Sequence, residues 1–174
     1  IEEAFIRHVP WSAEAEQSVL GGLFCDNSAW DRVGDLLSAD SFFDRRHQFV
    51  FEAIGSLVNA NKPADIVTVF DVLKARKRAE DVGGLAYLNQ LSQCVPSATN
   101  ARRYAEIVHE KAASRALITA TDQAATIAIG EGDAAPKADR IVALFDQLQR
   151  SQVKQGPQAA SSLMAARIDH YSAM

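Results

Sequence analysis

The sequence has few cysteines and no long hydrophobic run. Its two cysteines, Cys25 and Cys94, lie far apart and match no metal-ligand or redox spacing, so we expect both to be buried or half-buried apolar residues. No window approaches the ~20 uninterrupted apolar residues that cross a bilayer, and no basic and apolar leader with a cleavage site opens the sequence. These absences predict a soluble cytoplasmic protein that does not bind a membrane.

The sequence also lacks a basic excess. Its 18 lysines and arginines are outnumbered by 22 acidic residues, and the net charge is -4. Proteins that bind nucleic acid through its phosphates usually carry a clear positive excess. Protein partners are therefore favoured over DNA for this chain. The basic groups Arg45/Arg46, Arg76–Arg78 and Arg102/Arg103 are interpreted as solvated helix faces.

No stretch shows the two-residue alternation of a β-strand, whereas apolar residues recur at three- and four-residue spacing throughout. This pattern predicts an all-α fold. Ser12 and Asp44 are expected to cap helices, and Ser28–Asp31 and Thr68–Asp71 have capping-box patterns. Residues 1–99 are thus predicted to form a compact bundle of about six short helices. Its candidate core aromatics are Trp30, Phe42, Phe43, Phe49 and Phe51.

Residues 100–153 are predicted to form a long antiparallel helical hairpin. Asn100 to Ile129 contains no proline or glycine and allows one helix of ~30 residues and ~45 Å. Gly130–Asp133 supplies a turn, and Lys137–Val153 returns as a second helix. Because two helices alone cannot bury both apolar faces, we expect the exposed stripe to pair with a second copy in a four-helix interface. The predicted interface residues are Tyr104, Ile107, Val108, Leu117, Ile118, Ile129, Ile141, Leu144, Phe145 and Leu148.

Residues 154–174 are predicted to be a linker followed by the start of a tethered helix. Ser161 or Ser162 can cap this helix, which has one apolar face. A short amphipathic helix on a tether is suited to docking on a neighbouring chain. The alternative is that it frays. The expected docking residues are Leu163, Met164, Ile168 and Tyr171.

The motifs of an enzyme are missing from the sequence. There is no phosphate-binding Gly-x-x-x-x-Gly-Lys-Ser/Thr loop, so ATP binding is not encoded in this segment. The histidines have no metal-ligand spacing, and the pairs Glu14/Glu16 and Glu80/Asp81 fit helix starts and solvated turns. We therefore assign no catalytic, cofactor-binding or metal-binding residue. The four histidines, expected to be solvated or half-buried, are His8, His47, His109 and His170.

One segment, Ala13–Leu23 (AEAEQSVLGGL), resembles the opening signature of the DnaB-type replicative helicases. Further stretches resemble that family in the same order, so that the resemblance covers roughly Val9 to Val153. They are Asn27–Leu37, His47–Ile54, Pro63–Val69, Val82–Leu88 and Pro96–Val108. Cys94-Val95-Pro96 departs from the family pattern, in which a threonine is expected before the proline, and this puts only a local cap in doubt.

The resemblance implies a helical globule plus hairpin, with hairpins pairing into a trimer-of-dimers collar above six ATPase domains of a hexamer. It also implies that the collar binds primase and, in some systems, a loader protein, and that the tethered helix packs on the adjacent subunit's motor domain. The parent protein is then an ATP-dependent DNA helicase that binds single-stranded DNA through its hexamer. Its ATP and Mg²⁺ sites are expected in a domain that this chain does not contain.

Two other classes of function are weighed against this one. Six short helices with basic doublets could contain a helix-turn-helix, which would make the chain a stand-alone DNA-binding module. The acidic balance speaks against that alternative. A small-molecule enzyme would need a polar pocket with a shifted titratable group, and the sequence offers no candidate.

Overall fold

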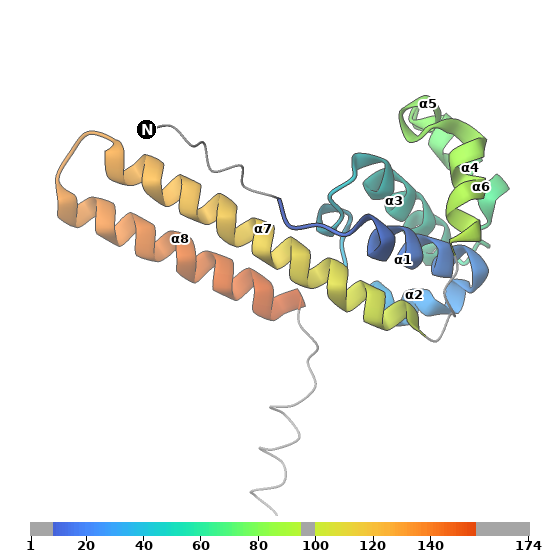
Figure 1. Cartoon of the computed structure of the whole chain (residues 1–174), viewed down its shortest axis with the longest axis horizontal. Helices are drawn as coiled ribbons and strands as arrows, with labels where there is room; N and C mark the ends of the chain where they lie inside the picture. The colour runs from blue at the N-terminus through green and yellow to red at the C-terminus, as the bar shows by residue number, and fades with distance from the viewer. Residues whose placement is uncertain (1–8, 95–99, 156–174) are drawn as a thin grey trace, which may run out of the picture.

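The computed structural model describes residues 9–94 and 100–155, and all regular structure within them is helical. This confirms the predicted all-α fold, with two long helices packed antiparallel after a bundle of short ones (Figure 1). We call the bundle the head and the two long helices the hairpin. In order the elements are α1 (Ala13–Cys25), η1 (Asn27–Ala29), α2 (Trp30–Val33), η2 (Ala39–Ser41), α3 (Arg45–Asn59), α4 (Ile66–Ala75), α5 (Ala79–Val82), α6 (Gly84–Gln93), α7 (Ala101–Ile129) and α8 (Ala134–Gln155), where η1 and η2 are 3-10 turns.

Two of the predicted helix caps are present. The Ser12 hydroxyl accepts a hydrogen bond from the backbone N–H of Ala15 at 3.2 Å and begins α1. The Asp44 carboxylate accepts from the backbone N–H of Arg46 at 2.9 Å and begins α3. Each cap satisfies a donor that the first helical turn leaves without a partner.

The two predicted capping boxes are wrong in register. Asp26 caps η1, and its carboxylate accepts hydrogen bonds from both the backbone N–H and the hydroxyl of Ser28. The Ser28 hydroxyl is therefore bonded to Asp26 and does not cap the backbone N–H of Asp31. Asp65 and Thr68 form the reciprocal box that begins α4, three residues before the predicted one. In both cases an upstream aspartate, which caps at least as well as serine or threonine, takes the position.

The core of the head lies among α1, α3, α4 and α6. Phe42 and Phe51 are buried with ring centres 4.9 Å apart, and the half-buried Trp30 packs against Phe51 at the same distance. Phe49 is half-buried, whereas Phe43 is exposed, which corrects its prediction as a core residue. Phe42 has an extended backbone, and neighbouring side chains on extended backbone point in opposite directions. Cys25 is also exposed rather than buried.

The long helix α7 belongs to both parts of the molecule. Its first half packs against α1 and buries Ala101, Ala105 and Val108 in the core of the head. Its second half extends beyond the head, where α8 runs back along it (Figure 1). The predicted hairpin is thus present, although α8 begins at Ala134 and continues to Gln155, two residues into the predicted linker. The helix predicted after residue 160 lies outside the described residues.

Candidate assembly surface and its anchor on the head

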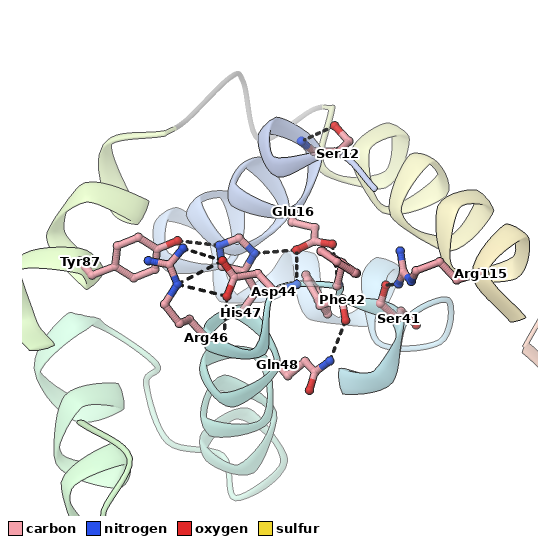
Figure 2. A network of polar contacts seen from close by, with 12 residues as sticks. Ser12, Glu16, Ser41, Phe42, Asp44, Arg46, His47, Gln48, Tyr87 and Arg115 are labelled. Atoms are coloured by element: carbon pink, nitrogen blue, oxygen red, sulfur yellow. Dashed lines mark hydrogen bonds and ion pairs between the residues drawn. The ribbon is translucent and has the colours of Figure 1, made fainter. Parts of the chain in front are cut away.

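The carboxylate of Glu16 on α1 is a fully buried charged group of the head. Glu16 is 1% exposed and accepts hydrogen bonds from the backbone N–H groups of Phe43 at 2.7 Å and Asp44 at 3.3 Å. Its Oε2 atom also lies 2.7 Å from Nδ1 of His47, which is equally buried (Figure 2). A buried carboxylate is costly unless its oxygens are satisfied, and here three contacts do so. Glu16 therefore joins α1 to the start of α3.

His47 extends this contact to α6. An ionised carboxylate can only accept, so the hydrogen in the contact between Glu16 and His47 is assigned to Nδ1 of His47. The other ring nitrogen, Nε2, lies 2.7 Å from the Tyr87 hydroxyl. Burial raises the pKa of Tyr87, while a hydrogen bond with Gln17 opposes the shift. The raised pKa keeps the hydroxyl protonated at neutral pH, so it donates to Nε2 when His47 carries its one ring hydrogen on Nδ1. Glu16, His47 and Tyr87 thus form a chain of hydrogen bonds across three helices (Figure 2).

The sequence offered a signal for this cluster that our interpretation missed. Glu16 was assigned to a helix start and His47 to a solvated or half-buried position. Both lie on the apolar stripes of their helices, since Glu16 precedes Val19 and Leu20 by three and four residues, and His47 stands in the same relation to Val50 and Phe51. A charged residue in phase with such a stripe indicates a buried, paired group.

Arg115 anchors the middle of α7 on the head. Its guanidinium donates to the backbone carbonyls of Pro10 at 2.9 Å and Ser41 at 2.6 Å, and it lies 5.6 Å from the centre of the Phe43 ring. Burial lowers the pKa of Arg115, and the nearby charge of Glu16 opposes this shift. This single α7 side chain therefore contacts the segment before α1, the η2 turn and the ring of Phe43. Figure 2 shows Arg115 beside Ser41.

The predicted interface residues fall into three groups. Val108 is buried in the head, and Tyr104 and Ile107 are half-buried against its core, so the expected continuous exposed stripe is corrected at its head end. Apolar positions of α7 that face α1 are already covered there. Half-buried positions of the hairpin are Ile118, Ile141, Leu144 and Leu148. The exposed ones are Leu117, Ile129 and Phe145.

The free surface of the hairpin includes one further apolar residue. Val142 on α8, which the sequence interpretation omitted, is 60% exposed, and Ile129 at the end of α7 is 86% exposed. Val142 and Phe145 are three residues apart and are neighbours on one face of α8. A cavity of about 450 Å³ lies between the two helices and is lined in part by Thr119 and Ile127 of α7 and Leu144 of α8. The hairpin therefore presents uncovered apolar side chains and a hollow between its helices.

Residues 8–110 match the family model described as the DnaB-like helicase N terminal domain. The chain belongs to this family. It is 35% identical over 165 residues to the replicative DNA helicase DnaB of Pasteurella multocida, covering 92% of this chain and 35% of that protein. The DnaB of Geobacillus stearothermophilus is 37% identical over 152 residues, covering 86% of this chain and 32% of the relative. The chain spans about a third of the length of these curated relatives.

One solved structure agrees with this membership, and a second shares the fold. The crystal structure of the N-terminal domain of DnaB helicase from Mycobacterium tuberculosis superposes with a TM-score of 0.76 at 36% identity, covering 80% of this chain and 99% of that one. A DnaB-like replicative helicase superposes with a TM-score of 0.66 over 91% of this chain and 35% of its own, at 17% identity, and shows the shared fold alone. The segment that carried the resemblance, Ala13–Leu23, lies within α1 and contains the buried Glu16.

Residues 9–94 and 100–155 contain no group of three or more histidine, cysteine or acidic side chains placed to hold a metal ion. Within the same ranges, no helix has the length and apolar character needed to span a bilayer. Leu163, Met164, Ile168 and Tyr171, the predicted linker-helix docking residues, lie outside the described residues.

Proposed function

We propose that this chain is the oligomerisation domain of a replicative helicase, in which the hairpins of two copies pack into a four-helix interface. The observation that carries the proposal is the uncovered apolar surface of the distal hairpin, with Ile129, Val142 and Phe145 exposed. Burying a side chain of this size contributes about 1.5–3 kcal/mol. A second copy offers the same surface, so one symmetric contact covers both.

The dimer is tested by light scattering on single variants. Val142→Asp and Phe145→Asp place a charge on the proposed interface, and we expect both to convert a dimer into a monomer. Val67→Asp is the matched control, because Val67 is 65% exposed on α4 of the head. We expect this control to remain a dimer. A wild-type chain that stays monomeric at high concentration, or a Val67→Asp variant that dissociates equally, contradicts the proposed interface.

At the level of the whole protein, we propose that three such dimers form a collar in a hexamer that unwinds DNA with ATP and Mg²⁺. Support comes from the identity to replicative helicases of which this chain matches about a third. The nucleotide and metal sites would then lie outside this chain. The proposal is checked in the full-length protein, where Phe145→Asp is expected to lower hexamer content and unwinding together while ATP binding by isolated subunits persists.

We further propose that the collar binds primase and, in some systems, a loader protein. Support is limited to likeness of fold, since the solved DnaB-like replicative helicase described with its interactions with primase shares this fold at 17% identity. A pull-down with the C-terminal region of the cognate primase tests it. We expect the wild-type chain and Val67→Asp to retain primase if the dimeric hairpin forms the site. Retention of primase by a monomeric Phe145→Asp chain would instead place the site on the head.

A further inference from the structure

A cavity of about 350 Å³ lies where the first turn of α3 meets α5, on a side of the head not involved in the hairpin contacts described above. Its lining residues are Arg45, Arg46, Phe49, Arg78 and Asp81. The guanidinium carbons of Arg45 and Arg78, from different elements, lie 5.5 Å and 4.7 Å from the centre of the same Phe49 ring. That of Arg46 lies 4.3 Å from the ring centre of Tyr87. Three cations therefore line one cavity beside aromatic rings.

The positive charge of this cavity is only partly neutralised. Arg46 pairs with Asp44 at 2.6 Å and Arg78 with Asp81 at 3.1 Å. No carboxylate oxygen of the described chain lies within 4 Å of Arg45. A guanidinium has five N–H donors, so these pairs leave most of the donors of the three side chains to solvent or a ligand. A local cationic excess thus occurs in a chain whose net charge is -4.

The position of these arginines is unfavourable for the fold alone. Arg45 and Arg46 occupy the first turn of α3, where the helix dipole favours negative groups. Arg45 and Arg78 also place like charges against one ring, that of Phe49. Asp44 and Asp81 compensate Arg46 and Arg78 only in part, and Arg45 has the ring contact with Phe49 but no ion pair among the described residues. Such departures from local rules are expected at functional sites. An anion between the guanidinium groups would remove both conflicts.

We propose that this cavity binds the phosphate group of a small phosphorylated ligand. A phosphate presents up to two negative charges and three terminal oxygens, and it can accept bonds from several guanidinium forks at once. A carboxylate offers one charge and two oxygens, and Asp44 and Asp81 already fill that role for two of the arginines. A long nucleic-acid strand would need a wider basic surface than one three-arginine cluster on an acidic chain.

Binding is tested by calorimetry and ³¹P NMR with inorganic phosphate and pyrophosphate as probes. We expect saturable binding of both, tighter for pyrophosphate. Arg45→Gln/Arg78→Gln should weaken it by at least about tenfold, because charge-assisted hydrogen bonds are lost. Arg102→Gln/Arg103→Gln is the matched control, since these exposed α7 arginines lie outside the cavity, and it should bind like the wild type. Arg45→Lys/Arg78→Lys keeps the charge without the fork and should give an intermediate loss.

Three results would overturn the proposal. One is the absence of saturable binding of either probe to a wild-type chain whose circular dichroism shows it folded. Another is equal affinity in the wild type and in a folded Arg45→Gln/Arg78→Gln chain. The third is tighter binding of an acidic peptide or of an oligothymidylate without a terminal phosphate than of pyrophosphate, when that binding is lost in the same double variant. This last outcome would assign the cavity to a macromolecule.

Discussion

The head and the distal hairpin are stabilised in different ways. The head buries large apolar side chains from several helices, among them Leu20, Leu23, Phe42 and Ile54. In the hairpin, no residue from 121 to 151 is buried. A two-helix unit has too little interior to cover its own apolar face. The head therefore carries its own stability, whereas the distal hairpin leaves the apolar side chains of Ile129, Val142 and Phe145 uncovered.

Buried polar groups follow the same division. The head contains Glu16 and His47 at 1% exposure, held in a defined chain of hydrogen bonds. In the distal hairpin, the Thr126 and Ser151 hydroxyls donate to backbone carbonyls of their own helices, and Lys137 of α8 donates to the exposed carbonyl of Ala128 at the end of α7. None of these groups is buried, so these contacts contribute little to the tertiary arrangement. Stability of the head should therefore be sensitive to single polar substitutions, and that of the distal hairpin should not.

The largest effect is expected for Glu16→Ala. This substitution leaves His47 and the N–H groups of Phe43 and Asp44 without their buried acceptor, and it should lower the free energy of unfolding by about 3–5 kcal/mol. Urea unfolding followed by tryptophan fluorescence measures it. Both tryptophans, Trp11 and Trp30, lie outside the hairpin, so the signal reports on the head.

Glu14→Ala is the control for Glu16→Ala. Glu14 lies in the same first turn of α1 but is exposed, so its loss should change stability by less than about 0.5 kcal/mol. The stability loss of Glu16→Gln should fall between those of Glu14→Ala and Glu16→Ala. The amide keeps one acceptor oxygen, but its NH2 group replaces the other oxygen and faces groups that are themselves donors. Equal stability of the Glu14→Ala and Glu16→Ala chains would show that the buried network contributes nothing and would remove this part of the contrast.

A second, smaller effect is expected where α1 meets the end of α6. A Cβ atom on Gly21 would lie 2.6 Å from the carbonyl oxygen of Leu91 and 2.8 Å from that of Cys94, so backbone must move. Gly21→Ala should cost about 1–3 kcal/mol. At Gly22 a Cβ meets only Ala101 at 3.6 Å, an ordinary contact. Gly22→Ala should be neutral or stabilising by up to about 1 kcal/mol, because alanine favours the helix.

The same urea titration distinguishes the two alanine variants. They differ by one residue in one helix, so composition and helix propensity change equally, and only the packing of α1 on α6 separates them. If the Gly21→Ala chain is as stable as the Gly22→Ala chain, the backbone of the head can move to accommodate the added methyl group at little cost in free energy. The head would then be less rigid than its buried core suggests, and the contrast with the hairpin would weaken.

Much of the fold could be predicted from the sequence, because local rules decide it. The uninterrupted stretch before Gly130 specified α7, and Ser12 and Asp44 marked helix starts through their own side chains. The capping boxes failed because two caps competed within a few residues, and spacing alone does not rank Asp26 above Ser28 or Asp65 above Thr68. The presence of a helix therefore follows from the local sequence. The residue at which it starts depends on which of several neighbouring side chains caps it.

The surface was harder to predict than the helices. Periodicity placed Val108 on an apolar stripe but could not say that α1 covers it, because that contact joins residues far apart in the chain. Val142 was omitted although it is more exposed than Phe145. Arg115 gave no signal, since its partners are backbone carbonyls of Pro10 and Ser41, which no side-chain pattern marks. What remained hidden depended on long-range packing.

Arg115→Gln tests the contact between the middle of α7 and the head. Of the substitutions considered, apart from the controls, it should lower the free energy of unfolding least. The guanidinium bonds two carbonyls but remains partly solvated, so its loss should cost only about 1 kcal/mol of stability. Arg103→Gln is the control, since the exposed Arg103 side chain forms an ion pair with Glu106 at 3.4 Å, and an exposed pair of this kind should contribute almost nothing.

Hydrogen exchange locates the change in the Arg115→Gln chain. If Arg115 holds the middle of α7, amides around residues 112–120 should exchange faster, while those near Ala105 and Val108 keep the protection of the core of the head. Faster exchange along all of α7 would mean that the helix docks on the head as one unit. In that case the part of α7 that does not belong to the stable head would extend back towards Ala101. No change at any amide would mean that apolar contacts alone fix α7. The hydrogen bonds from Arg115 to the backbone carbonyls of Pro10 and Ser41 would then contribute nothing to holding α7 on the head.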